Sequence, residues 1–222
     1  HNIFMIKTAI KACLEAGEIL KFSYKKQIEI VLKDNNPRDY LTRVDLASQE
    51  KILKIIKEKY PDHNIIAEEN KKNFIKNKND YYWIIDPLDG TSSFVNKNVY
   101  FGISLSLYKN NRPILGVIYF PMTDELFSAE KGQGSFLDRK VKLKTSKIND
   151  LTKALLGMSW ASSSDEFRLS GLKIFYELGL TVKKIAKEGS CTSSLIGVAS
   201  NKFDVAIMGG GKLWDIAAAD LI

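Results

Sequence analysis

Cysteine and histidine are scarce in this chain of 222 residues, which contains two of each. Cys13 and Cys191 are too few and too far apart in sequence to form a disulfide framework or a metal knuckle. Cys13 falls on the apolar stripe of an expected helix, which favours a place in the core. No apolar run is long enough to cross a bilayer, and no signal peptide is visible. The sequence therefore argues against disulfide-stapled and membrane-spanning classes and favours a reducing, cytoplasmic location.

Two well-known catalytic loops are also missing. The segment 157–161 lacks the final glycine of a nucleophile elbow. The segment 209–212 lacks the spacing and the Ser or Thr of a phosphate-binding P-loop. We therefore expect neither mechanism.

Positive charge is in excess but is not concentrated. The chain carries 33 basic and 26 acidic residues, a formal charge of +7. A basic surface attracts anionic substrates and partners over long range. The lysines, however, are spread over a helix and a loop, without the interleaved aromatics of a nucleic-acid-binding patch. We interpret them mainly as solvated faces, and a non-catalytic RNA- or partner-binding protein stays as an alternative from a different class.

Hydrophobic periodicity divides the chain into two halves. Residues 3–20 and the segment after Asp45 predict amphipathic helices, the second of which ends before Pro61. Short apolar runs predict strands at 65–67, 81–85, 101–108, 114–120, 126–129 and 141–143. Strands and helices then alternate, with strands at 155–158, 182–186 and 203–207 and helices at 165–178 and after Gly189-Ser190. We expect an N-terminal α+β half over residues 1–145 and a C-terminal α/β half over residues 146–222, and the abrupt end of the last apolar run predicts that the second half is truncated.

Three acidic clusters lie at the ends of apolar elements, where each carboxylate would have a rigid support. They are Glu68-Glu69 after the run 65–67, the segment Asp86-Pro87-Leu88-Asp89-Gly90-Thr91 after Trp83-Ile84-Ile85, and Trp214-Asp215 at the start of an expected Ala-rich helix. Surface Glu pairs and Asp-Gly turns are common without any function, so the first and third clusters alone would not indicate a site.

The segment 86–91 carries the most specific pattern. Asp86 and Asp89 are three residues apart around a proline-stiffened turn, so both carboxylates and the Leu88 carbonyl can face one pocket. Gathered carboxylates repel one another, and a hard divalent cation such as Mg²⁺ removes that penalty through oxygen ligands. Gly90 and Thr91 offer N–H groups and a hydroxyl to phosphate oxygens. No histidine lies nearby, which favours Mg²⁺ over Zn²⁺.

Together the clusters resemble the inositol monophosphatase family. The stretch 84–91 followed by Phe94 is similar to the family's signature, and the segments 67–69 and 214–218 are similar to its preceding and C-terminal motifs, in the family's order. Thr42-Arg43-Val44-Asp45 and Gly189-Ser190 also match family positions. The resemblance covers nearly the whole chain.

The resemblance implies two to three Mg²⁺ ions per site. Glu68, Asp86 and the Leu88 carbonyl would bind one ion. Asp86, Asp89 and Asp215 would bind a second, and Glu68 would take part in holding a weaker third.

The resemblance also implies catalytic and substrate-binding residues. Asp45 and Thr91, with Glu68 beside them, would orient and deprotonate a metal-activated water that attacks a small phosphate monoester in line. The phosphate would contact Asp89, Gly90, Thr91, Gly189 and Ser190. The fold implied is the layered α-β-α-β-α sandwich of the sugar-phosphatase superfamily, an α+β or α/β class, and the implied protein is a lithium-sensitive homodimer.

One departure leaves the substrate open. Inositol-preferring members carry Glu seven residues before the aspartate of the Trp-Asp pair, where this chain has Met208. A thioether is a poor partner for ring hydroxyls, so inositol, fructose bisphosphate, histidinol phosphate and other sugar phosphates all remain candidates. A 3′(2′),5′-bisphosphate nucleotidase of the same superfamily is the closest alternative, although the segment 211–213 does not resemble that branch.

Overall fold

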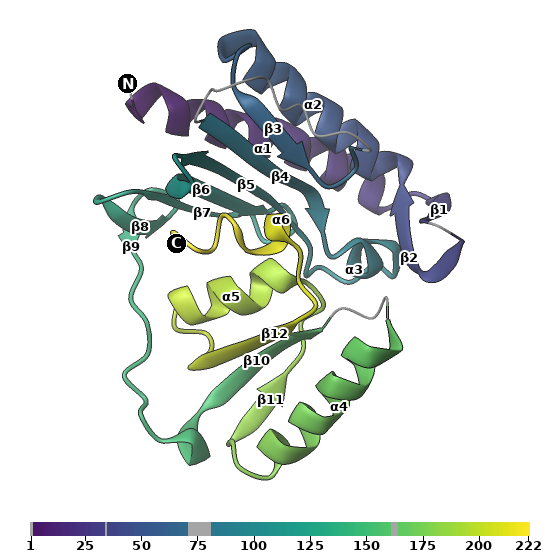
Figure 1. Ribbon diagram of the computed structural model, residues 1–222, viewed down its shortest axis with the longest axis vertical. Helices are drawn as coiled ribbons and strands as arrows, with labels where there is room; N and C mark the ends of the chain where they lie inside the picture. The colour runs from purple at the N-terminus through teal and green to yellow at the C-terminus, as the bar shows by residue number, and fades with distance from the viewer. Residues whose placement is uncertain (1, 34, 71–80, 161–163) are drawn as a thin grey trace.

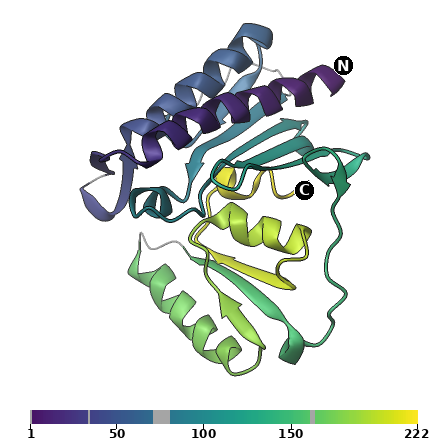
Figure 2. The ribbon, with the colours of Figure 1, turned by 180° about the vertical axis from the view of Figure 1, so that it is seen from behind.

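The computed structural model describes residues 2–33, 35–70, 81–160 and 164–222. Helices α1 (Asn2–Tyr24) and α2 (Arg43–Lys59) cover one face of a seven-stranded sheet (Figure 1). Helices α5 (Cys191–Ala199) and α6 (Leu213–Ile216) lie between this sheet and a three-stranded sheet, whose other face is covered by α4 (Asp165–Gly179). Figure 2 shows the same succession of layers from behind. The expected α-β-α-β-α sandwich is confirmed.

The larger sheet is a meander with one parallel pair. Its strands, in spatial order, are β3 (Asn64–Ala67), β4 (Tyr81–Asp89), β5 (Gly102–Lys109), β6 (Arg112–Phe120), β7 (Glu125–Glu130), β8 (Gly134–Leu137) and β9 (Val141–Lys142). Only β3 and β4 are parallel. The predicted strands of this half are confirmed, and β8 was not predicted because its glycine suggested a turn.

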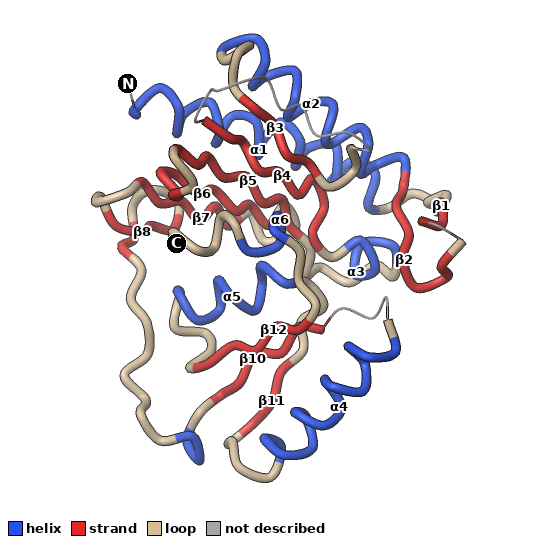
Figure 3. The backbone as a smooth tube through the Cα atoms, in the orientation of Figure 1, coloured by secondary structure: helices blue, strands red, loops and turns tan. Residues whose placement is uncertain are grey.

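The smaller sheet is parallel, with the order β11-β10-β12 (Figure 3). Its strands are β10 (Leu155–Trp160), which follows a 3₁₀ turn at Leu151–Lys153, β11 (Lys184–Ala186) and β12 (Val205–Gly209). The chain steps from β10 to one side through α4 and returns across β10 through α5. Right-handed crossovers in opposite directions place the two helices on opposite faces. The division into halves at residues 145 and 146 stays a prediction.

Hydrophobic packing on both faces of the larger sheet supports this arrangement. Trp83, Phe101 and Leu105 are fully buried in the cluster beneath α1 and α2, and so is Cys13, as predicted. A smaller cluster on the opposite face joins Phe127 to α5. No helix in the described part of the chain is both long and apolar enough to cross a membrane.

The Ala-rich run at 217–219 is not the helix that the sequence predicts. Helix α6 ends at Ile216 and the chain continues in turns. Ser104 and Tyr108 donate side-chain hydrogen bonds to the carbonyls of Trp214 and Ala217, at 3.1 and 3.3 Å. A Cβ on Gly116 would lie 2.5 Å from a backbone oxygen of this run, so the segment packs its backbone directly on β6. The sheet thus takes up carbonyls that a longer helix would use itself.

Two elements near the site were not predicted. A hairpin of β1 (Ile30–Lys33) and β2 (Asn36–Thr42) precedes α2, and the short helix α3 (Thr91–Val95) follows β4. Strand β2 is mostly polar and contains a proline, so it has no apolar pattern. Strand β1 carries the apolar run 30–32, but it is only four residues long and largely exposed.

Candidate metal centre and active site

Asp86 and Asp89 are buried neighbours on one bulged strand. Side chains three residues apart on a regular strand point to opposite faces. In the pairing of β4 with β5, however, Asp86 faces Ser104 and Asp89 faces Gly102, so β4 contains one extra residue between them. This bulge brings both carboxylates to the same side. Pro87, which has no N–H to donate, fits at such an irregular position. The predicted turn is therefore wrong in form, but the predicted meeting of the two carboxylates is confirmed.

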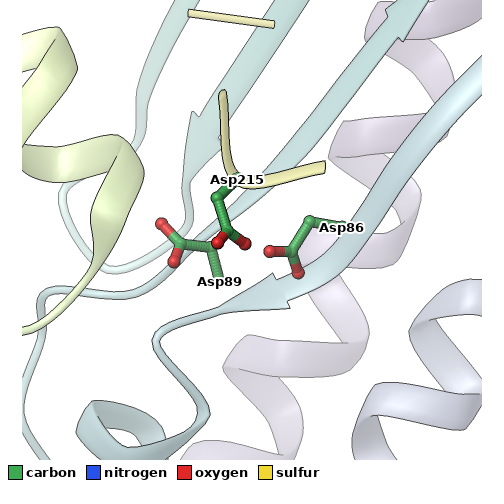
Figure 4. A group of neighbouring side chains, drawn as sticks. All are labelled: Asp86, Asp89 and Asp215. Carbon is green, nitrogen blue, oxygen red and sulfur yellow. The ribbon is translucent and has the colours of Figure 1, made fainter. Parts of the chain in front are cut away.

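Asp215 joins this pair from α6, which is tied to β5 through Ser104. One carboxylate oxygen from each of Asp86, Asp89 and Asp215 lies within 4.8 Å of the other two. Figure 4 shows Asp215 descending from the C-terminal segment toward the two aspartates of the strand. Three of the predicted metal ligands, from sequence positions far apart, thus form one cluster.

The three carboxylates of the cluster lie close together in a largely buried place and would be stabilised by a cation. Burial, together with Glu68 and Asp89, raises the pKa of Asp86 well above its usual range. Burial and Asp89 raise the pKa of Asp215 to about 7. Burial also raises the pKa of Asp89, against the opposing effect of its hydrogen bonds from Thr192. Within the described ranges no lysine or arginine pairs with these three aspartates. Closely spaced oxygen ligands without a counter-charge are the donor set that Mg²⁺ prefers, so the residues fit such an ion.

Glu68 lies at the edge of the cluster. Its backbone N–H donates to the carbonyl of Ile85 at 3.1 Å, which fixes it beside β4. Besides burial, the charge of its carboxyl contributes to the raised pKa of Asp86. Its Oε1 also accepts a 2.9 Å bond from Lys33, whose ammonium bonds Glu69 at 2.7 Å. Sequence reasoning missed Lys33, because only the β1–β2 hairpin brings it to the glutamates.

Asp45 and Thr91 form a hydrogen-bonded pair next to the cluster. The Thr91 hydroxyl lies 3.1 Å from Asp45 Oδ1 and 3.2 Å from the Leu88 carbonyl, and its single proton can serve one acceptor at a time. Asp45 Oδ2 accepts the backbone N–H of Thr42 at 2.8 Å, as part of a capping box at the start of α2. Burial raises the pKa of Asp45, although the hydrogen bonds from Thr42 oppose the rise.

The two segments expected at the phosphate lie against each other. Gly90 and Gly189 both have positive φ, +86° and +101°, which favours glycine at each position. A Cβ on Gly90 would lie 2.9 Å from the Cβ of Ser190. Ser93, on α3, donates a 3.2 Å bond to the carbonyl of Gly189. The predicted residues of both segments therefore share one small region beside Asp89.

Asp89 also caps helix α5. Its two carboxylate oxygens accept the backbone N–H groups of Cys191 and Thr192 at 3.1 and 2.7 Å, and the Thr192 hydroxyl donates to it as well. Ser190 is the N-cap residue and accepts the N–H of Ser193 at 3.1 Å. An anionic side chain at a helix N-terminus is stabilised by the helix dipole. Thr192 is a contact that the sequence did not reveal.

Sulfur atoms border the cluster on the side of the smaller sheet. A Cβ on Gly211 would lie 2.7 Å from the terminal carbon of Met208 and 3.5 Å from Asp215 Oδ2, so the thioether stands close to the Asp215 carboxylate. Ser159, paired with Met208 across β10 and β12, donates a 3.2 Å bond to the sulfur of Cys191. Burial and then Asp89 raise the pKa of this thiol. Both sulfur-containing side chains thus lie on one side of the acidic cluster.

Comparison with known proteins agrees with this geometry. The sequence profile of the inositol monophosphatase family matches residues 2–222. The Nus factor SuhB of Haemophilus influenzae is 34% identical over 219 residues, which cover 98% of this chain and 81% of that protein. The crystal structure of the extragenic suppressor protein suhB from Bartonella henselae has a TM-score of 0.91 at 25% identity, covering 98% of this chain and 83% of that one. The inositol monophosphatase of Anabaena (Nostoc) has a TM-score of 0.86 at 29% identity, covering 100% of this chain and 81% of that one.

Proposed function

The chain belongs to the inositol monophosphatase family, and on that premise we propose that it is a Mg²⁺-dependent phosphatase that hydrolyses small phosphate monoesters by direct attack of water. The observation that carries the proposal is the convergence of Asp86, Asp89 and Asp215 within 4.8 Å of one another. The hydrogen-bonded pair of Asp45 and Thr91 lies beside them. The cluster supplies ligands, and the pair supplies a proton acceptor.

Two to three ions would be held by this site. Asp86, Asp89 and Asp215 would bind one, and Glu68, Asp86 and the Leu88 carbonyl would bind another, with Glu68 contributing to a third. Bound divalent ions neutralise charge on the phosphate and lower the pKa of a water molecule.

The remaining steps belong to the chain's own residues. Because Thr91 donates its proton to Asp45, its oxygen can accept a hydrogen bond from water and orient it. The raised pKa of buried Asp45 makes this carboxylate a better proton acceptor than an ordinary aspartate. Glu68, at the edge of the cluster, is a second candidate base. Gly90, Thr91, Gly189 and Ser190, together with Asp89, would border the phosphate.

Phosphate release from a panel of substrates tests the proposal. Inositol monophosphate, fructose 1,6-bisphosphate, histidinol phosphate and adenosine 3′,5′-bisphosphate would each be assayed with Mg²⁺ and again with excess chelator. We expect turnover of at least one ester that is lost with the chelator, and preference for the adenosine substrate would favour the nucleotidase alternative. Turnover that persists in the chelator, or no turnover of any ester in Mg²⁺, would contradict the proposal.

The preferred substrate would depend on the residues that face the alcohol part of the phosphate ester, among them Met208. Met208 stands close to Asp215 and offers no carboxylate to ring hydroxyls. We therefore propose a preference for sugar or polyol phosphates other than inositol monophosphate, and the same panel measures it.

A second candidate function comes from the relatives that carry the name Nus factor SuhB. With a formal charge of +7, a role in binding RNA or a protein partner is a separate proposal from catalysis. RNA binding would weaken steeply as salt increases. Asp89→Asn separates the two roles, because it should remove Mg²⁺-dependent turnover and leave salt-sensitive binding unchanged.

Three further properties are proposed on the family resemblance. They are a cytoplasmic location, a homodimer in solution and inhibition by lithium. Light scattering with size exclusion would test the dimer, and full activity in millimolar lithium would count against the third.

A further inference from the structure

We propose that Lys33 is an internal counter-cation that competes with a divalent ion for Glu68 and keeps its bond to Glu69 when that ion binds. The inference rests on the proposed function only in requiring that the acidic cluster binds a divalent ion. It concerns a residue that neither the sequence pattern nor the predicted ligand set includes.

The first support is the uneven distribution of positive charge around the site. Lys33 bonds Glu68 and Glu69 at 2.9 and 2.7 Å. In the described part of the chain, it is the one lysine or arginine that pairs with any of the site carboxylates. Asp86, next to Glu68, has no such partner there. The ammonium therefore neutralises the outer edge of the cluster and leaves its interior uncompensated.

The second support is the position of Glu68, whose carboxylate faces both Lys33 and the acidic cluster. Its Oε1 already accepts the Lys33 ammonium, and its backbone N–H donates to the carbonyl of Ile85, the residue before Asp86. A divalent ion that used Glu68 together with Asp86 would lie next to the ammonium, and two cations this close repel each other strongly. The ammonium and the divalent ion therefore compete for the Glu68 carboxylate.

The third support is Glu69, which gives Lys33 a second place to bind. The Glu69 side chain is 3% exposed, against 21% for Glu68. A buried carboxylate without a partner is costly, so the bond from Lys33 to Glu69 should persist when Glu68 is taken. The exchange then requires a shift of one side chain, not unfolding of the hairpin.

The backbone aims Lys33 at this place. The register of the β1–β2 hairpin shifts between Leu32 and Lys33, and irregularities of this kind re-aim a side chain. The hairpin is also held at other points, by a 2.6 Å ion pair of Arg38 with Asp165 and a 3.1 Å hydrogen bond of Tyr40 with Ser92. Lys33 is thus presented from an anchored element.

Calorimetric titration of the metal-free protein with Mg²⁺ tests the proposal. Lys33→Met should bind the weakest ion about tenfold more tightly than wild type, the effect of removing one positive charge a few ångströms from a divalent ion in a largely hydrated setting. Lys33→Arg keeps the charge and should bind as wild type does. Lys51→Met, which removes a lysine paired with the distant Glu15 at 3.3 Å, is the matched control and should change affinity less than twofold.

Thermal unfolding with and without Mg²⁺ gives a second readout. Lys33→Met should lower the melting temperature in chelator, because Glu68 and Glu69 lose their partner. Mg²⁺ should then raise the melting temperature of the variant by more than it raises that of wild type. A purely structural lysine would lower the melting temperature equally in both conditions and leave the affinity unchanged, and that result overturns the proposal. If wild type binds no Mg²⁺ at all, both this inference and the proposed metal centre are wrong.

Discussion

Asp215→Asn should stabilise the metal-free protein at pH 8, although it removes a carboxylate of the proposed metal site. Burial and Asp89 raise the pKa of Asp215 from 3.8 to about 7 in the folded protein. At pH 8 the folded chain therefore carries a carboxylate that its surroundings disfavour. An amide of nearly the same shape carries no such charge.

The magnitude follows from that rise in pKa. A change from 3.8 to about 7 corresponds to about 4 kcal/mol of stability between low and high pH. Asp86 and Asp89 share protons with Asp215 and would redistribute them after the substitution. We therefore expect a net gain of about 1–2 kcal/mol at pH 8, or about 3–6 °C in melting temperature.

The size and sign of the stability change caused by Asp215→Asn depend on pH and on bound metal. Because the folded-state pKa lies above the unfolded value, the contribution to stability is present below pH 3.8 and is lost as pH rises through about 7. The gain from Asp215→Asn should accordingly be smaller at pH 5 than at pH 8. Saturating Mg²⁺ should reverse it, because the carboxylate then has a counter-charge that the amide cannot match.

Urea unfolding in chelator at pH 5 and pH 8, and in Mg²⁺ at pH 8, measures these effects. Asp204→Asn is the matched control, because the carboxylates of Asp204 and Asp215 each accept one backbone N–H at 2.7 Å. The pKa of Asp204 is lowered by its hydrogen bond from Leu155, so its substitution should destabilise the protein at pH 8 with or without metal. A loss of stability for Asp215→Asn in chelator at pH 8, or an equal effect at both pH values, would refute the reasoning.

Substitutions at Asp89, Thr91 and Gly90, with matched variants at Thr91 and Gly132, probe the site from different sides. Asp89→Asn should lower kcat about a thousandfold, equivalent to about 4 kcal/mol, while circular dichroism stays that of wild type; wild-type rates in saturating Mg²⁺ would remove Asp89 from the site. Thr91→Ala should lower kcat about a hundredfold, and Thr91→Ser should recover most of it because the hydroxyl remains. Gly90→Ala should cost about 2–4 kcal/mol in urea unfolding, from its positive φ and the contact with the Ser190 segment. Gly132→Ala, with positive φ but open space around it, should cost only about 1 kcal/mol, and equal losses would contradict the packing argument.

Much of the candidate site could be predicted because its carboxylates follow apolar strands. Glu68 directly follows β3 and Asp86 stands near the end of β4, and parallel pairing of these two strands brings their ends together. The order of the longer strands and helices was also visible in the hydrophobic pattern, whereas β1, β2, β8 and α3 were not. The local pattern was sufficient for most of the strands, including the one that carries Asp86 and Asp89, but the layered arrangement was expected only from the family resemblance.

Other features depend on contacts that no local pattern contains. The Ala-rich run after α6 has high helix propensity, yet its backbone lies flat on the sheet. Tyr108 on β5 donates to the Ala217 carbonyl, and Gly116 on β6 leaves room for the backbone of the run. Ser104, also on β5, donates to the carbonyl of Trp214 within α6. Tertiary hydrogen bonds outweigh propensities of a few tenths of a kcal/mol per residue.

The sequence by itself indicated which side chains could bind metal and that they lie at or near the ends of apolar segments. Only the tertiary structure decided that a bulge turns Asp86 and Asp89 to one side, that Asp89 caps α5 through Thr192, and that Lys33 reaches Glu68. The physical reason is that strand register and the packing of separate elements arise from contacts between residues far apart in the chain.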